Sequence, residues 1–253
     1  MANTLDIKNT EDFNSVIKVE PHYTSGLPVG IIAVELIYPK LPGNVANAST
    51  FKFPVLYETV RFEIEELFRG DEKIKQLIID AAKKLEAQGV RAIVGACGFF
   101  AHFQKDVKNA VNVPVYLSSL CQIPLISTGL KNEKKIAVIA ADGKSITNNL
   151  LEKVGADDSS LVVFNVGDWE SFAPIRYGKT ELDNKALTQD LEKLAKNIGE
   201  NHKEIGAILL ECSDLPPYAY NIQRASGLPV YDFITLINWV EHSVEQRPYY
   251  GIM

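Results

Sequence analysis

Short apolar runs alternate with helical patterns along most of this chain, and this alternation limits its fold more than any other feature. The runs have the length and composition of strands that are buried on both faces, as in a parallel sheet. They lie at Pro28–Leu36, Val90–Ala96, Val113–Leu117, Lys135–Ala141, Leu161–Val166, Gly206–Leu210 and Leu228–Tyr231. Strands that alternate with helices predict an α/β fold, in which helices cover mainly parallel sheets through right-handed crossovers.

Two of the intervening segments have the spacing of amphipathic helices. In residues 71–88 and again in residues 181–204, apolar side chains recur three and four positions apart. Gly89 follows the first segment, where a helix would end. The segment Tyr38–Tyr57 fits neither period and is rich in Pro, Gly, Asn and Ser. We expect it to form a long ordered loop after the first strand, where folds of this class bind ligands.

The chain also contains an internal repeat that is centred on two cysteines. The same Ala-Ile pair precedes Cys97 and Cys212 at the same distance, and a Pro-Val pair follows each at the same distance. A repeated unit of strand, cysteine, helix and strand predicts two similar lobes. We expect one lobe to comprise residues 1–117 and 231–253 and the other residues 118–230, with one cysteine in each lobe.

Charge and composition exclude several classes of protein. The net charge is -6 without a basic stripe, which argues against nucleic acid or an anionic membrane as partner. No apolar run approaches the roughly 18 to 20 residues that cross a bilayer. The first residues lack a basic and apolar leader, so we expect a cytoplasmic protein. Three cysteines without Cys-x-x-Cys spacing and four histidines predict neither a disulfide framework nor a metal site.

Cys97 and Cys212 both stand where a buried strand gives way to a turn. Gly98 would let the backbone approach a ligand, and Ser213 or the aspartate after it could cap the next helix. A helix N-terminus beside each sulfur would lower the thiol pKa and bind an anion. A single cysteine is otherwise a small core residue, and the shared position of these two in the repeat is what favours a functional interpretation.

These segments resemble the aspartate/glutamate/hydantoin racemase superfamily, in a less characterised branch. The resemblance rests on Gly-Ala-Cys-Gly-Phe at 95–99, Leu-Glu-Cys-Ser-Asp-Leu-Pro-Pro-Tyr at 210–218 and the loop at 39–54. It implies two pseudo-symmetric Rossmann-like lobes with the active site in the cleft between them, a homodimer, and a racemase or epimerase that needs no cofactor. One thiolate would remove a proton from a carbon next to a carboxylate or carbonyl, and the opposite thiol would return one to the other face.

The motifs and the loop suggest further residues of the site. The expected substrate contacts are Gly98, Phe99, Ser118, Ser119, Ser213, Asn44 and Asn47. Glu35 falls where relatives carry an acidic residue, and it would orient or tune Cys97; its alternative is a capping or surface carboxylate. The two asparagines are alternatively ordinary turn residues.

Two other functions remain open from the sequence. Relatives with one or two of these cysteines isomerise a cis-dicarboxylate or decarboxylate a malonate, and a two-lobed protein could also bind a metabolite without catalysis. Amino-acid racemases of the superfamily carry Asn-Thr after the first cysteine and Thr after the second, where this chain has Gly98-Phe99 and Ser213-Asp214. The substrate therefore stays open among small carboxylates and hydantoin-like rings.

Overall fold

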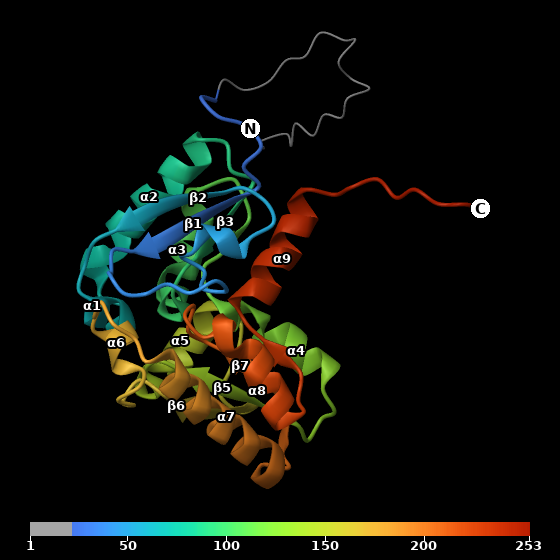
Figure 1. Ribbon diagram of the computed structural model, residues 1–253. Helices are drawn as coiled ribbons and strands as arrows, with labels where there is room; N and C mark the ends of the chain where they lie inside the picture. The colour runs from blue at the N-terminus through green and yellow to red at the C-terminus, as the bar shows by residue number, and fades with distance from the viewer. Residues whose placement is uncertain (1–21) are drawn as a thin grey trace.

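Two parallel four-stranded sheets, each flanked by helices, make up the protein (Figure 1). The structure is a computed structural model and describes residues 22–253. Each apolar run identified in the sequence forms a strand, so the predicted α/β fold with two similar sheets is confirmed. In the described part of the chain, no helix is long and apolar enough to cross a membrane.

The first sheet has the strand order β2-β1-β3-β4. Its strands are β1 (Val29–Val34), β2 (Val55–Val60), β3 (Ala92–Gly95) and β4 (Val115–Tyr116). The helices in this half are α1 (Ile64–Arg69), α2 (Lys75–Ala87) and α3 (Gln104–Ala110), and α4 (Ile123–Gly129) leads to the second half. The sequence analysis missed β2, because this edge strand is only partly buried and its Glu and Thr interrupt the apolar run.

The second sheet has the order β6-β5-β7-β8, which repeats the first sheet strand for strand. Its strands are β5 (Lys135–Ala140), β6 (Leu161–Asn165), β7 (Ile205–Leu210) and β8 (Val230–Tyr231). Its helices are α5 (Asn148–Lys153), α6 (Ala173–Arg176), α7 (Asn184–Asn201) and α8 (Ala219–Ser226). The internal repeat is therefore structural, and β3 and β7 hold equivalent positions.

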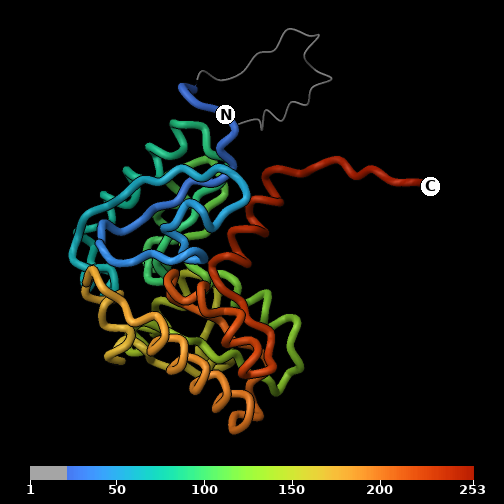
Figure 2. The backbone as a smooth tube through the Cα atoms, viewed as in Figure 1, coloured from blue at the N-terminus to red at the C-terminus, as the bar shows by residue number. Residues whose placement is uncertain are grey.

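The last helix, α9 (Phe233–Val244), returns from the second sheet to the first (Figure 2). Its apolar side chains share a core with β1 and β3, in which Phe233 is fully buried. Asp232 and Thr235 begin the helix with a reciprocal pair of hydrogen bonds between side chain and backbone. Another core spans both sheets and includes Ile93 and Val138. The exact lobe boundaries stay a prediction, and residues 1–21 of the first lobe lie outside the described residues.

Helices α7 and α8 approach each other closely at Gly199, which supports the segment after the second cysteine. A Cβ at this position would lie 2.3 Å from the carbonyl oxygen of Ser226. Gly199→Ala should therefore destabilise the fold by about 1–3 kcal/mol, although Ala is the better helix former. Urea unfolding measures the change. Gly129→Ala in α4 is the control, because no atom lies within 4 Å of its Cβ position; equal effects of the two substitutions would contradict the close helix contact.

Candidate active site

Cys97 and Cys212 each stand one residue beyond the end of the equivalent strands β3 and β7. The Ser213 hydroxyl donates a hydrogen bond of 2.8 Å to the carbonyl oxygen of Ala96, so the two cysteine turns are bonded to each other. Cys97 is half-buried, and Cys212 is 6% exposed. Ligands of open α/β sheets bind at the carboxyl ends of the strands. The structure thus brings the two predicted cysteines together at one such edge.

Glu211 lies fully buried between the two turns, and the sequence analysis did not identify it. Its Oε2 accepts a hydrogen bond of 3.1 Å from the backbone N–H of Ala141, whereas its Oε1 has no partner among the described residues. A Cβ on Gly98 would lie 2.0 Å from Oε1, so this glycine is required by Glu211. Burial raises the pKa of Glu211 to about 8. The sequence does contain a signal for Glu211: it is a charged residue that follows an apolar strand and directly precedes Cys212.

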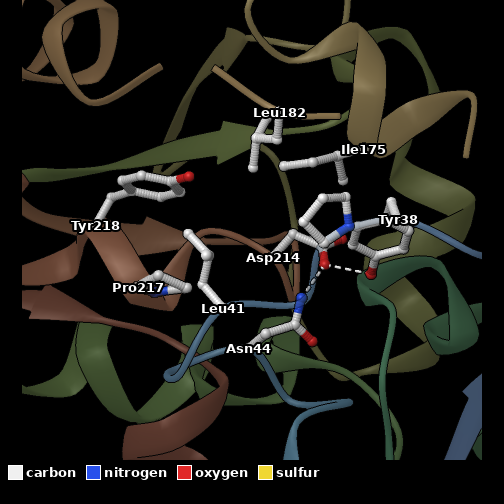
Figure 3. A pocket seen from close by; sticks show the side chains of 9 residues that line it. Tyr38, Leu41, Asn44, Ile175, Leu182, Asp214, Pro217 and Tyr218 are labelled. Carbon is white, nitrogen blue, oxygen red and sulfur yellow. Dashed lines mark hydrogen bonds between the residues drawn. The ribbon is translucent and has the colours of Figure 1, made fainter. Parts of the chain in front are cut away.

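Asp214 accepts hydrogen bonds from three side chains, two of which are drawn in Figure 3, those of Tyr38 and Asn44. The donors are the Tyr38 hydroxyl at 2.5 Å, the Asn44 Nδ2 and the Cys212 Sγ at 3.3 Å. Burial raises the pKa of Asp214, and these hydrogen bonds and Lys40 lower it. Tyr38 and Asn44 belong to the predicted loop after β1, so this loop reaches the turn that carries Cys212. Asp214 consequently holds the loop and does not cap a helix.

The pKa values of both thiols are raised, which corrects the prediction that helix N-termini would lower them. Burial raises the pKa of Cys97 most, Glu211 raises it further, and the backbone N–H of Phe99 lowers it. Burial, Asp214, Glu211 and Cys97 all raise the pKa of Cys212. The helices that follow the two turns begin as short 3-10 segments. Their few free N–H groups do not offset burial beside two carboxyl groups.

Three predicted substrate contacts have structural roles. The Phe99 side chain is fully buried with its ring centroid 4.6 Å from that of Phe68, so only its backbone N–H faces Cys97. The Ser118 hydroxyl accepts the N–H of Leu120 at 3.1 Å and begins a short 3-10 helix. The hydroxyl of the fully buried Ser119 donates to carbonyl oxygens at the end of β7. The Ser118 hydroxyl therefore stabilises its own 3-10 segment, and the Ser119 hydroxyl joins that segment to the end of β7.

The other predicted residues divide between the site and its surroundings. Asn44 and Ser213 contact the site through the hydrogen bonds described above. Asn47 stabilises its own loop, because its Nδ2 donates to the Lys40 carbonyl oxygen at 2.9 Å. Glu35 is exposed, and the described groups that shift the pKa of Cys97 do not include it. The geometry therefore gives no support to the predicted tuning of Cys97 by Glu35.

Solved structures confirm the fold that the resemblance implied. Allantoin racemase from Pseudomonas fluorescens has a TM-score of 0.55 at 16% identity over 88% of this chain and 100% of its own. A variant of arylmalonate decarboxylase has a TM-score of 0.54 at 18% identity over 89% of this chain and 98% of its own. At such identities the likeness shows the fold alone. No family model matches the chain.

Curated relatives identify the family. Dimethylsulfoniopropionate lyase from Durusdinium is 31% identical over 233 residues, which are 88% of this chain and 77% of the relative. The chain belongs to the dimethylsulfoniopropionate lyase family. Dimethylsulfoniopropionate lyase 3 from Emiliania huxleyi is 33% identical over 236 residues. The chain spans 61% of the length of this second lyase.

Membership in the lyase family corrects the predicted reaction. The prediction of a racemase or epimerase, and with it the isomerase class, is wrong, because these relatives are named as lyases. The alternative predicted for the same fold, which included a decarboxylase, agrees better with the names of these relatives, since a decarboxylase is itself a lyase. Racemases and a decarboxylase share this fold, and a shared fold does not determine the reaction.

The raised pKa of Glu211 predicts that stability depends on pH. The folded protein holds this proton up to about pH 8, whereas the unfolded chain releases it near the ordinary value of 4.5. The stability that this protonated carboxyl group contributes is complete below about pH 4.5 and is lost as the pH rises to about 8. Relative to wild type, the permanently neutral Glu211→Gln should gain up to about 5 kcal/mol of unfolding free energy between about pH 5 and about pH 9.

Urea unfolding at several pH values measures this difference. Glu241→Gln is the control, because Glu241 also has a buried oxygen without a hydrogen-bond partner but lies on α9 with Arg247 3.7 Å away. This control measures what replacing a buried glutamate by glutamine does elsewhere in the fold. Parallel curves for wild type and Glu211→Gln would show that Glu211 is ionised in the folded protein and would contradict the account.

Proposed function

We propose that this protein acts on dimethylsulfoniopropionate, the compound in the names of its relatives, and releases dimethyl sulfide by elimination. The name of the compound describes a propionate that carries a dimethylsulfonium group. The observation that carries the proposal is the meeting of two thiols with two buried carboxyl groups, in a chain of the lyase family. A thiol can serve as base, and the carboxyl groups suit a cationic substrate.

The proposed elimination breaks two bonds of the substrate. With the sulfonium on C3, the proton on C2 is acidified by its position next to the carboxylate carbon and is removed by a cysteine thiolate. The electron pair of the C2–H bond forms the C2–C3 double bond, and the pair of the C3–S bond leaves with sulfur. The products are acrylate and neutral dimethyl sulfide, and the proton stays on the cysteine until it passes to solvent.

We assign proton removal to Cys97. This residue is half-buried, so it is the more exposed of the two, and the backbone N–H of Phe99 stabilises its thiolate. Cys212 is more buried, and its thiol donates a hydrogen bond to Asp214. In this assignment Cys212 forms the facing wall of the site and holds the Asp214 carboxylate.

The substrate itself promotes ionisation of the base. In the free protein, burial and the carboxyl groups of Glu211 and Asp214 raise the pKa of Cys97, so the thiol is protonated. A bound sulfonium brings a positive charge to the same place, and a nearby cation favours the thiolate. The free enzyme therefore keeps its cysteine in the less reactive form, and substrate binding converts it into the base.

The two cysteines should respond differently to substitution. Cys97→Ser should lower kcat/KM for release of dimethyl sulfide by about 10²–10⁴-fold, because a serine hydroxyl is a far weaker acid than a thiol and supplies no base. Cys212→Ser should lose less activity than Cys212→Ala, since its hydroxyl can still donate to Asp214. Gas chromatography of dimethyl sulfide above the reaction measures the rates.

Cys121→Ser is the matched control. Cys121 contacts Gln104 and is not bonded to either cysteine turn, so its loss should leave the rate close to that of the wild type. Circular dichroism checks that each variant is folded. A wild-type rate in Cys97→Ser would remove Cys97 as the base, and absence of dimethyl sulfide with the unmodified protein would reject the proposed function.

A further inference from the structure

Glu211 is a buried titratable group that has no part in the proposed elimination, although it contacts the turns that form the site. It directly follows β7 and precedes Cys212. Its Oε2 accepts the N–H of Ala141, which follows the neighbouring strand β5 (Figure 1). On the other side, a Cβ at Gly98, the residue after Cys97, would lie 2.0 Å from Oε1 and 2.6 Å from Cδ. The carboxyl group therefore lies between the turns that carry the two thiols.

The surrounding backbone holds Glu211 in this position. Its N–H donates to the carbonyl oxygen of Ile139 at 2.9 Å, and its carbonyl oxygen accepts from the Ser119 hydroxyl at 3.1 Å. The residue is fully buried, and Oε1 has no hydrogen-bond partner among the described residues. A charge that forms on this carboxyl group consequently stays beside the cysteines and is not shared with water.

In the described part of the chain, no cation is paired with Glu211. None of the ion pairs there includes this residue. The charged groups that act on it are Asp214, from the turn after β7, and Asp142, from the turn after β5. Lys40 acts on Asp214 but is not among the groups that act on Glu211. Ionisation of Glu211 would therefore add a further negative charge to a site that already contains acidic groups.

Glu211 loses its proton at a lower pH than the two thiols do. Its pKa is raised to about 8, mainly by burial, whereas burial and the neighbouring carboxyl groups raise the thiol pKa values well above their ordinary value. Because these groups interact, the proton that leaves near pH 8 comes mainly from Glu211 and not from a thiol. The charge that remains on Glu211 then opposes a second negative charge on either sulfur.

We propose that Glu211 is a positioning residue that sets the charge of both cysteines: neutral, it permits a thiolate, and ionised, it opposes one. It acts through Cys97 and Cys212 and needs no contact with the substrate. Its effect on the release of dimethyl sulfide rests on the proposed function, in which the Cys97 thiolate is the base. Alkaline solution activates an isolated thiol, but here it gives Cys97 no further gain once Glu211 is ionised.

The rate at which iodoacetamide alkylates Cys97 tests this role without any substrate. In the unmodified protein the rate should rise about tenfold per pH unit up to about pH 8 and then level off, because the proton lost there comes from Glu211. Glu211→Gln keeps the shape of the side chain and cannot ionise, so its rate should continue to rise. At pH 9 the variant should react about tenfold faster than the wild type, and at pH 7 the two rates should be similar. A role in packing alone would change the rate by the same factor at every pH.

Two controls accompany this measurement. Cys121 is alkylated in the same samples, and Glu211 is not among the groups that shift its pKa, so its pH profile should be the same in both proteins. Glu241→Gln changes a buried glutamate of α9 and should keep the break near pH 8 in the Cys97 profile. A Cys97 rate that rises unbroken beyond pH 8 in the unmodified protein would overturn the proposal, as would a break that survives in Glu211→Gln.

The kinetics of dimethyl sulfide release separate this inference from the function on which it rests. The pH dependence of kcat/KM reports groups of the free enzyme, so kcat/KM should level off where alkylation does and should keep rising in Glu211→Gln. A break in alkylation without release of dimethyl sulfide would support the role of Glu211 and reject the reaction. Release of dimethyl sulfide with an unbroken alkylation profile would support the reaction and reject the role of Glu211.

Discussion

The site depends on one contact, the hydrogen bond from the Ser213 hydroxyl to the carbonyl oxygen of Ala96. Because the two sheets repeat the same strand order, β3 and β7 end at equivalent points, and this contact joins those ends. One thiol from each half thereby reaches a common place. The close fit of Gly98 against Glu211 and the bonds from the Ser119 hydroxyl to carbonyl oxygens of β7 strengthen the same junction. A change at this junction acts on both cysteines at once.

Buried carboxyl groups give the junction its chemical character. Glu211 is buried with one oxygen unpartnered, and Asp214 is surrounded by neutral donors. Both groups raise the pKa of Cys97 and Cys212, which makes the empty site unfavourable for a thiolate. The carboxyl group of Asp214, whose hydrogen-bond donors are neutral side chains, favours a cation at the same place. A substrate with a sulfonium group would therefore correct the electrostatic defect that keeps the thiols protonated, and binding and activation would have one physical cause.

The sequence predicted the fold well because the central strands are continuous apolar runs and the cysteine repeat marks their equivalent ends. It did not reveal β2, whose edge position leaves its side chains partly exposed. It also missed Glu211 and offered Asp214 as a possible helix cap, because their partners lie just after β5 and on the loop after β1, far away in the chain. The reaction was predicted wrongly, since racemases and a decarboxylase share this fold, and the charge around the thiols becomes visible only in three dimensions.

Alkylation of the cysteines in the presence of substrate tests most directly whether both thiols belong to one substrate site. Iodoacetamide modification of the unmodified protein, followed by mass spectrometry of its peptides, gives a separate rate for each cysteine. Saturating dimethylsulfoniopropionate should slow the modification of Cys97 and Cys212 together, because the bound substrate lies between them, and should leave Cys121 unaffected. Protection of only one of the two thiols, or of neither, would contradict the account.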